Sequence, residues 1–144
     1  GDIRGMQSSA LLIVGAQSTG RPWVDRIFDV RVDDHREPLK ELRRLVAVRR
    51  SYQHKSAGDR AFARGEIAQG NFEYEAAERL IGNNPEMRYW HAIALASVGQ
   101  LDAAAPILRE IFARDPNWRT LTARLPRGMF SLDDTVLARI CALE

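Results

Sequence analysis

The sequence contains a single cysteine, Cys141, among its 144 residues. One thiol excludes an internal disulfide and every zinc-binding pattern that needs several cysteines. It leaves the compartment open, because many exported bacterial proteins lack disulfides. We expect Cys141 to serve as a small buried apolar side chain.

Long apolar runs and an excess of one charge are also missing. The longest apolar run near the start covers residues 10–14, whereas a membrane-spanning helix needs about 20 residues. The same run is a poor signal peptide, because one arginine precedes it and no clear cleavage site follows. The 21 Lys and Arg residues are scattered among 19 Asp and Glu residues. The sequence therefore predicts neither a membrane nor a nucleic acid as partner.

Catalytic, metal and cofactor motifs are absent as well. There is no Gly-rich phosphate loop, and no Ser or Thr is spaced from a histidine as a nucleophile would be. The polar cluster of Asp33, Asp34 and His35 could bind a metal or act as acid and base, but we favour a role in ending a strand and capping the next helix. We expect His54 and His91 to pack between helices. We predict no catalytic residue, no metal site and no cofactor.

What the sequence does contain is a repeat. The stretch RGEIAQGNFEYEAAERL places Gly65 where VGQLDAAAPILREIF places Gly99, and 99 minus 65 is 34, the period of the tetratricopeptide repeat. The alternative is a pair of generic helical hairpins. With 45% hydrophobic residues the chain can bury a real core, so we predict a mainly α fold of tetratricopeptide-like hairpins with about five to seven helices. The same spacing pairs Gly58 with Ala92, Ile67 with Leu101, Gly70 with Ala104 and Tyr74 with Leu108.

Further helices are predicted on both sides of the repeat. Residues 37–52 read as one amphipathic helix with Pro38 in its first turn. After Pro116 we expect a short helix that Pro126 stops. Ser131 and Asp134 have the spacing of a capping box, and the helix that follows should cover the end of the array.

The first part of the chain has another character. SSALLIVGA and WVDRIFDVRVDD, within residues 8–34, are rich in branched and aromatic residues and flank the turn-like QSTGRP. This pattern indicates a β-hairpin. Since an isolated hairpin is marginal in water, we expect it to belong to a larger sheet.

A family resemblance rests on GDIRGMQSSALLIV, on DRIFDVRVDDHREPLKELRRL and on the helical repeats that follow. In these segments the chain resembles the C-terminal part of a bacterial family called domain of unknown function 1028. The resemblance implies that residues 1–36 are the last strands of an N-terminal-nucleophile-hydrolase-like sheet. It implies that residues 37–144 are an appended tetratricopeptide-like domain of the kind proposed to bind peptidoglycan. Such hydrolases attack with a first-residue Thr, Ser or Cys, whereas this chain begins with Gly1. We therefore expect the chain alone not to be an enzyme, and to be part of something larger.

The repeat frame also predicts a binding groove on the inner faces of the first helix of each hairpin. Its aromatic, charged and apolar groups could stack on sugar faces or clamp an extended peptide. The alternative is that neighbouring or terminal helices cover these side chains, and we expect Trp118 to plug the end of the second hairpin. The predicted groove residues are Tyr52, Lys55, Asp59, Phe62, Glu86, Tyr89, Trp90 and Ile93.

A local basic patch precedes the groove residues on the helix predicted over 37–52. It contains Arg43, Arg44, Arg49 and Arg50 and could meet phosphate or an acidic partner. We favour a solvated face paired with acidic neighbours.

These observations favour a non-catalytic interaction module that recruits a peptidoglycan fragment or a protein partner to an attached hydrolase. The rival interpretation is that the hairpin completes an amidase-type active site. A third is that the hairpin edges form a homodimer. We favour a bacterial cytoplasm slightly over the periplasm, without fixing the compartment.

Overall fold

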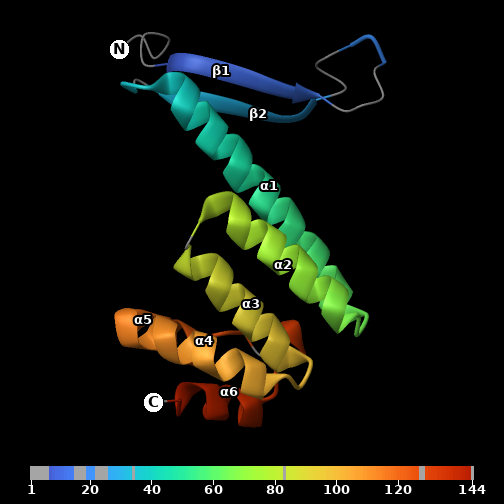
Figure 1. Ribbon diagram of the computed structural model, residues 1–144, viewed down its shortest axis with the longest axis vertical. Helices are drawn as coiled ribbons and strands as arrows, with labels where there is room; N and C mark the ends of the chain where they lie inside the picture. Colours follow the sequence, from blue (N-terminus) through green and yellow to red (C-terminus); the bar gives the residue numbers. More distant parts are fainter. Residues whose placement is uncertain are drawn as a thin grey trace. The chain divides into compact units, whose positions relative to one another are not determined.

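The computed structural model describes residues 7–14, 19–21, 26–33, 35–82, 84–126 and 129–143. The chain divides into two compact units, Gly1–Arg50 (unit 1) and Ser51–Glu144 (unit 2). Helix α1 (Pro38–Ala63) contributes to both units (Figure 1). The domain boundary predicted between residues 36 and 37 stays a prediction.

Unit 1 contains two strands and the first half of α1. Strand β1 (Gln7–Val14) pairs antiparallel with β2 (Arg26–Asp33), with Leu11 opposite Val30. Val32 of β2 and Leu42 of α1 are 4% and 7% exposed and form a small apolar cluster. His35 Nδ1 accepts a hydrogen bond of 3.0 Å from the backbone N–H of Glu37. His35 thus stands at the start of α1, as the capping interpretation expects.

The helix predicted over 37–52 is longer than expected. It does not end at Tyr52 but continues to Ala63, so the connecting helix and the first repeat helix form one element of 26 residues. Pro38 opens this helix as predicted. Its interior contains no proline and one glycine, Gly58, and a single interior glycine lowers helix stability by only about 1 kcal/mol relative to alanine.

Three glycines separate successive helices in the first part of unit 2, at the predicted places. Helix α2 (Ile67–Ile81) follows a turn at Gly65 with φ 74°, and it ends before Gly82 with φ 67°. Helix α3 (Pro85–Ser97) leads through Gly99, with φ 81°, into α4 (Leu101–Arg114). Positive φ favours glycine because it has no Cβ. Asn84 caps α3, its side chain accepting from the Glu86 N–H at 2.8 Å.

Three short elements complete the described part of unit 2: helix α5 (Asn117–Ala123), the 3-10 turn η2 (Met129–Ser131) and helix α6 (Asp134–Cys141). The predicted capping box at Ser131 is wrong. Asp133 caps α6, because its carboxylate accepts from the Val136 N–H at 2.7 Å, while Ser131 lies in η2. Cys141 is only partly buried, and this burial raises the pKa of its thiol.

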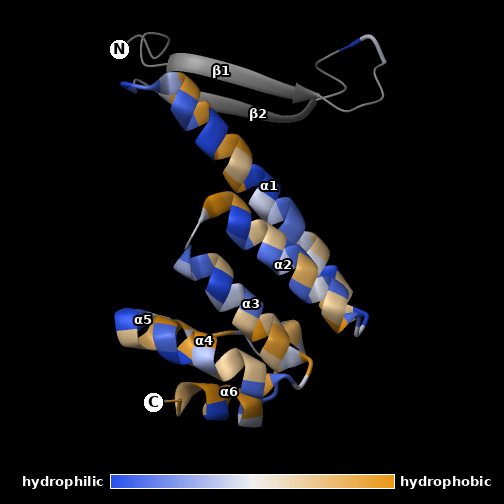
Figure 2. Cartoon of the chain, viewed as in Figure 1, coloured by the Kyte–Doolittle hydropathy of each residue, from blue (hydrophilic) through white to orange (hydrophobic). Residues whose placement is uncertain are grey.

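Helix α3 is the centre of unit 2. It packs on α2 and, more extensively, on α4 (Figure 1), and its hydropathy rises toward its C-terminal end (Figure 2). Ile140 of α6 is fully buried in the same core, so α6 covers apolar surface as predicted. The prediction of a mainly helical chain is confirmed for the described residues. The largest fully buried side chains are Tyr74, Tyr89, Met87, Ile93, Leu108 and Ile140.

Candidate functional site: the α1–α3 surface

Three of the eight predicted groove residues lie in the core of unit 2. Phe62 is 3% exposed, and Tyr89 and Ile93 are 0% exposed. The Tyr89 ring lies against Trp118 with 4.7 Å between centroids, and its hydroxyl meets Thr122 Oγ1 at 3.0 Å. Helix α5 therefore covers this part of α3. These three side chains are buried, as the alternative of covered side chains expects, although Phe62 also forms part of the wall of a cavity described below.

The remaining predicted residues come together on one face, which we call the α1–α3 surface. Its members are Tyr52, Lys55 and Asp59 of α1 and Glu86 and Trp90 of α3. Tyr52 is 37% exposed, and the other four are partly buried. The surface thus offers ring faces, one cation and two carboxylates within reach of solvent.

At one end of this surface, a hydrogen bond joins two residues that occupy the same position in successive repeats. The Tyr52 hydroxyl donates to Glu86 Oε1 at 3.0 Å, and the two residues are 34 apart. Partial burial, together with the bond to the neighbouring carboxylate, raises the pKa of Tyr52. The phenol therefore stays protonated at neutral pH and acts as a donor.

Lys55 is the centre of the surface. Its Nζ lies 2.8 Å from Asp59 Oδ2 and faces three rings, with 5.6 Å to the Trp90 centroid, 5.7 Å to Phe130 and 6.0 Å to Tyr74. An ammonium within about 6 Å of a ring centroid is attracted by the electrons of the ring face. The lysine side chain is only 15% exposed, so this charge is held in place by its neighbours.

Asp59 binds two groups at once. Besides Lys55, it accepts a hydrogen bond from the hydroxyl of the buried Tyr74. Burial and the adjacent carboxylate raise the pKa of Tyr74 far above its ordinary range, which keeps the phenol a donor. The contacts among Asp59, Lys55 and Tyr74 hold these groups in a fixed arrangement on the surface.

A cavity of about 210 Å³ continues the surface toward the end of α3. Its walls come from α1, from the end of α3 and from η2, and η2 packs on α3. Sequence reasoning missed Phe130, whose ring centroid lies 5.8 Å from that of Trp90. An apolar aromatic inside an otherwise turn-like stretch was the available signal. The cavity is lined by Asp59, Phe62, Ala63, Ser97, Val98, Phe130 and Ser131.

His91 packs between helices as predicted, whereas the side chain of His54 joins two helices but remains 41% exposed. His91 is 7% exposed and lies between α2 and α3, with Nδ1 2.9 Å from Glu78 Oε1 and Nε2 2.9 Å from Asn71 Oδ1. His54 Nδ1 of α1 lies 2.7 Å from Glu73 Oε2 of α2. No group of three or more metal-ligating side chains occurs among the described residues. The side chains of Asp33 and Asp34 lie outside the described residues.

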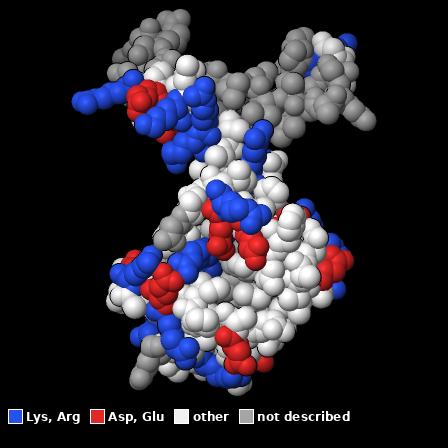
Figure 3. Space-filling view, in the orientation of Figure 1, with Lys and Arg blue, Asp and Glu red and all other residues white. Residues whose placement is uncertain are grey.

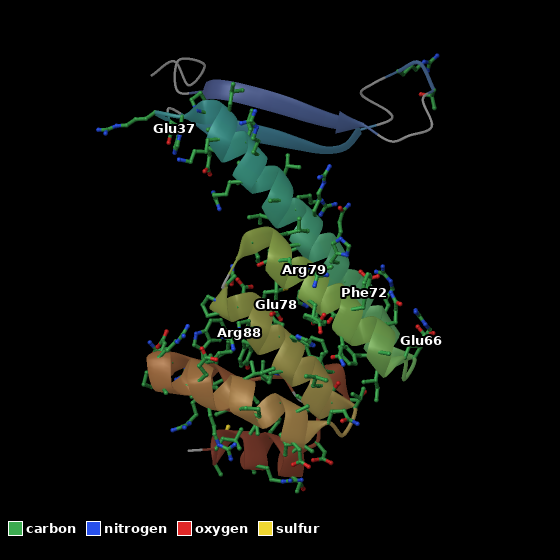
Figure 4. The ribbon with its side chains drawn as sticks, in the orientation of Figure 1. Glu37, Glu66, Phe72, Glu78, Arg79 and Arg88 are labelled. Carbon is green, nitrogen blue, oxygen red and sulfur yellow. The ribbon has the colours of Figure 1, made fainter. Side chains whose placement is uncertain are left out.

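Several charged residues elsewhere pair with one another. An open hollow of about 450 Å³ on α2 and α3 is lined by Glu75, Glu78, Arg79, Gly82 and Arg88, several of which are labelled in Figure 4. Arg79 pairs with Glu75, and Arg88 Nη2 lies 2.5 Å from Glu110 Oε2. In Figure 3, Lys and Arg are interspersed with Asp and Glu over the visible face of unit 2.

The predicted basic patch lies on α1 within unit 1. Arg44 Nη2 lies 2.6 Å from Glu41 Oε1. This ion pair is what the interpretation of a solvated face with acidic neighbours expects.

Comparisons with known proteins add no assignment: no protein-family model, no curated protein and no solved structure matches the chain. Within the described ranges, no helix is long and apolar enough to cross a membrane.

Proposed function

We propose that the chain carries a non-catalytic, tetratricopeptide-like interaction module, and that its α1–α3 surface binds an extended peptide. The observation that carries the proposal is the arrangement around Lys55. Its ammonium faces the Trp90 ring at 5.6 Å beside a carboxylate at 2.8 Å. Such a surface offers hydrogen-bonding groups of both kinds and an aromatic platform, the combination that clamps peptides.

The repeat assignment is supported by positions 34 residues apart. Gly65 and Gly99 both have positive φ at the turn inside a hairpin. At the helix crossing of the first hairpin, a Cβ added to Gly58 would lie 2.7 Å from Tyr74 Cδ2. Glycine there permits the close approach that this repeat requires.

Peptidoglycan and partner proteins are the two sources of such a peptide. The resemblance of the chain to the hydrolase-like family favours the cell wall. On that interpretation β1 and β2 belong to a larger hydrolase-like sheet, since two strands alone are marginally stable. The module then brings wall fragments or a protein partner to the attached hydrolase.

The test is cosedimentation of the chain with purified peptidoglycan sacculi. We expect the wild type to pellet, and we expect Trp90→Ala and Tyr52→Ala each to weaken binding by at least about 1 kcal/mol, or about fivefold. Phe72→Ala is the matched control, because Phe72 is 57% exposed on α2, away from the α1–α3 surface. Circular dichroism checks that each variant keeps its helicity.

The outcomes separate the two sources. If both surface variants pellet as the wild type does, the α1–α3 surface is not the site that binds sacculi. If the wild type does not pellet, the cell-wall source fails, and the same variants are tested against binders selected from a phage-displayed library of random peptides. Failure to select any binder that depends on Trp90 would overturn the peptide-binding proposal.

A further inference from the structure

A segment of this chain already lies on the α1–α3 surface. Phe130 of η2 places its ring centroid 5.8 Å from that of Trp90 and 5.7 Å from Lys55 Nζ. The same ring and Ser131 form part of the wall of the 210 Å³ cavity. Phe130 thus makes the contacts that an aromatic side chain of a bound peptide would make.

The backbone of this segment is strained. Phe130 and Ser131 have φ 54° and 55°, and they are the only positive-φ residues other than glycine among those described. A side chain in the left-handed region is disfavoured because its Cβ approaches the following carbonyl oxygen. The conformation persists only while other contacts compensate, and the contacts of the Phe130 ring with Trp90 and Lys55 are available for this.

The fit of the segment is also incomplete. Beneath Phe130 the cavity extends to Phe62 of α1 and to Ser97 and Val98 at the end of α3. Unfilled space of this kind lacks the dispersion contacts of a close-packed interface. A peptide that places an aromatic ring at the same spot and extends into the cavity would gain contacts that Phe130 does not make.

We infer that Phe130 is a displaceable internal occupant of the α1–α3 surface, and that the partner is a protein segment whose aromatic side chain takes its place. The inference rests on the proposed function and selects its protein source, because the stem peptides of peptidoglycan carry no aromatic side chain. The exchange is non-covalent. Because Phe130 is tethered, it competes at a high effective concentration, so the unmodified chain binds the partner more weakly than a chain whose occupant has been removed.

The experiment uses the segment itself as the probe. A fluorescein-labelled synthetic peptide with the sequence of residues 126–133, PRGMFSLD, is titrated by fluorescence anisotropy into the wild type, Phe130→Ala and the control Phe72→Ala. We expect the Phe130→Ala chain to bind at least about tenfold more tightly than the wild type and Phe72→Ala. The same peptide with alanine in place of phenylalanine should not bind.

A second variant acts in the opposite direction. Ser131→Gly removes the cost of a left-handed Cβ, so it stabilises the seated segment. Acrylamide quenching of tryptophan fluorescence should then decrease in Ser131→Gly and increase in Phe130→Ala, because Phe130 shields Trp90. The quenching measurement tests the inference even if the peptide binds too weakly for its affinity to be measured.

Equal peptide affinity in the wild type and a helical Phe130→Ala chain, or quenching that neither variant changes, would overturn the inference. Its failure is distinguishable from that of the proposed function. If binding of sacculi or selected peptides depends on Trp90 but is unchanged in Phe130→Ala, only the inference about Phe130 as an internal occupant is contradicted. If the peptide binds Phe130→Ala but the chain does not pellet with sacculi, only the hypothesis of a cell-wall ligand is contradicted.

Discussion

The two hairpins of unit 2 solve the same packing problem with different side chains. In the first, Gly58 and Gly70 leave room for the rings of Tyr74 and Phe62, because a Cβ at either glycine would lie within 2.7–2.8 Å of a ring atom. In the second, alanines occupy both glycine positions, and Leu108 and Ala96 occupy the positions of the two rings. The first hairpin therefore pairs residues without a side chain with large aromatic residues. The second pairs alanines with residues of small or medium size.

This difference bears on function. The Tyr74 ring brings a hydroxyl to Asp59 and a ring face to Lys55, so packing in the first hairpin also orders the charges of the α1–α3 surface. Leu108 carries no polar atom and is fully buried. The first hairpin therefore places polar atoms of its packed residues at the α1–α3 surface, whereas the equivalent position of the second hairpin is apolar.

The largest expected effect comes from giving the first hairpin the backbone of the second. Gly58→Ala should destabilise the chain by about 1–3 kcal/mol through overpacking against Tyr74, of which the helix propensity of alanine recovers at most about 1 kcal/mol. Urea unfolding measures the change.

The double variant Gly58→Ala/Tyr74→Leu recreates the Ala92 and Leu108 pair of the second hairpin. It should show a favourable coupling of about 0.5–3 kcal/mol relative to the sum of the single changes. Strict additivity would mean that the two hairpins do not balance volume in this way.

The two turns should respond alike. Gly65→Ala and Gly99→Ala each place a Cβ at φ 74° or 81°, and no atom lies within 4 Å of either Cβ position. The cost is therefore conformational alone, about 1 kcal/mol in each hairpin. Equal shifts in the urea midpoint are expected, and a clearly larger loss at one turn would show that the hairpins differ in more than packing.

The smallest effect concerns the polar contacts that join the two helices of each hairpin. His54 and Arg88 occupy equivalent positions and reach Glu73 and Glu110 on the partner helix. Arg88 lowers the pKa of Glu110 below its ordinary value. The stability that this pair adds is therefore present above the ordinary pKa of Glu, about 4.3, and is lost as the pH falls through the lowered pKa.

Glu110→Gln should accordingly flatten the decline of stability toward acid pH, with little change near neutrality. Urea unfolding at a series of pH values measures it. Parallel pH curves for the wild type and the variant would contradict the assignment.

The turns and helices could be read from the sequence because glycine and proline act locally. Gly65, Gly99 and Pro85 each set the backbone at their own position, and the structure has turns or helix starts there. The length of α1 could not be read in the same way, because no breaker marks residue 52 and tertiary contacts decide how far a helix continues.

The candidate site shows the same division. The 34-residue frame brought Tyr52 and Glu86 to one face, since equivalent positions of neighbouring repeats stack. It could not reveal that Tyr89 is covered, because the cover comes from Trp118 and Thr122, about 30 residues later. The position of Phe130 was likewise out of reach, as a short turn carries no periodic signal.

The imidazole of His91 has a consequence for assembly. Both of its nitrogens meet groups on α2, and its ring stacks on Tyr74 at 4.7 Å. Apolar contacts accept many partners, but a buried polar ring is left without hydrogen-bond partners against a helix that lacks them. In a chain built from similar hairpins, whose faces could also pair between two molecules, this joint makes docking onto the wrong copy costly and so protects the fold from hairpin exchange.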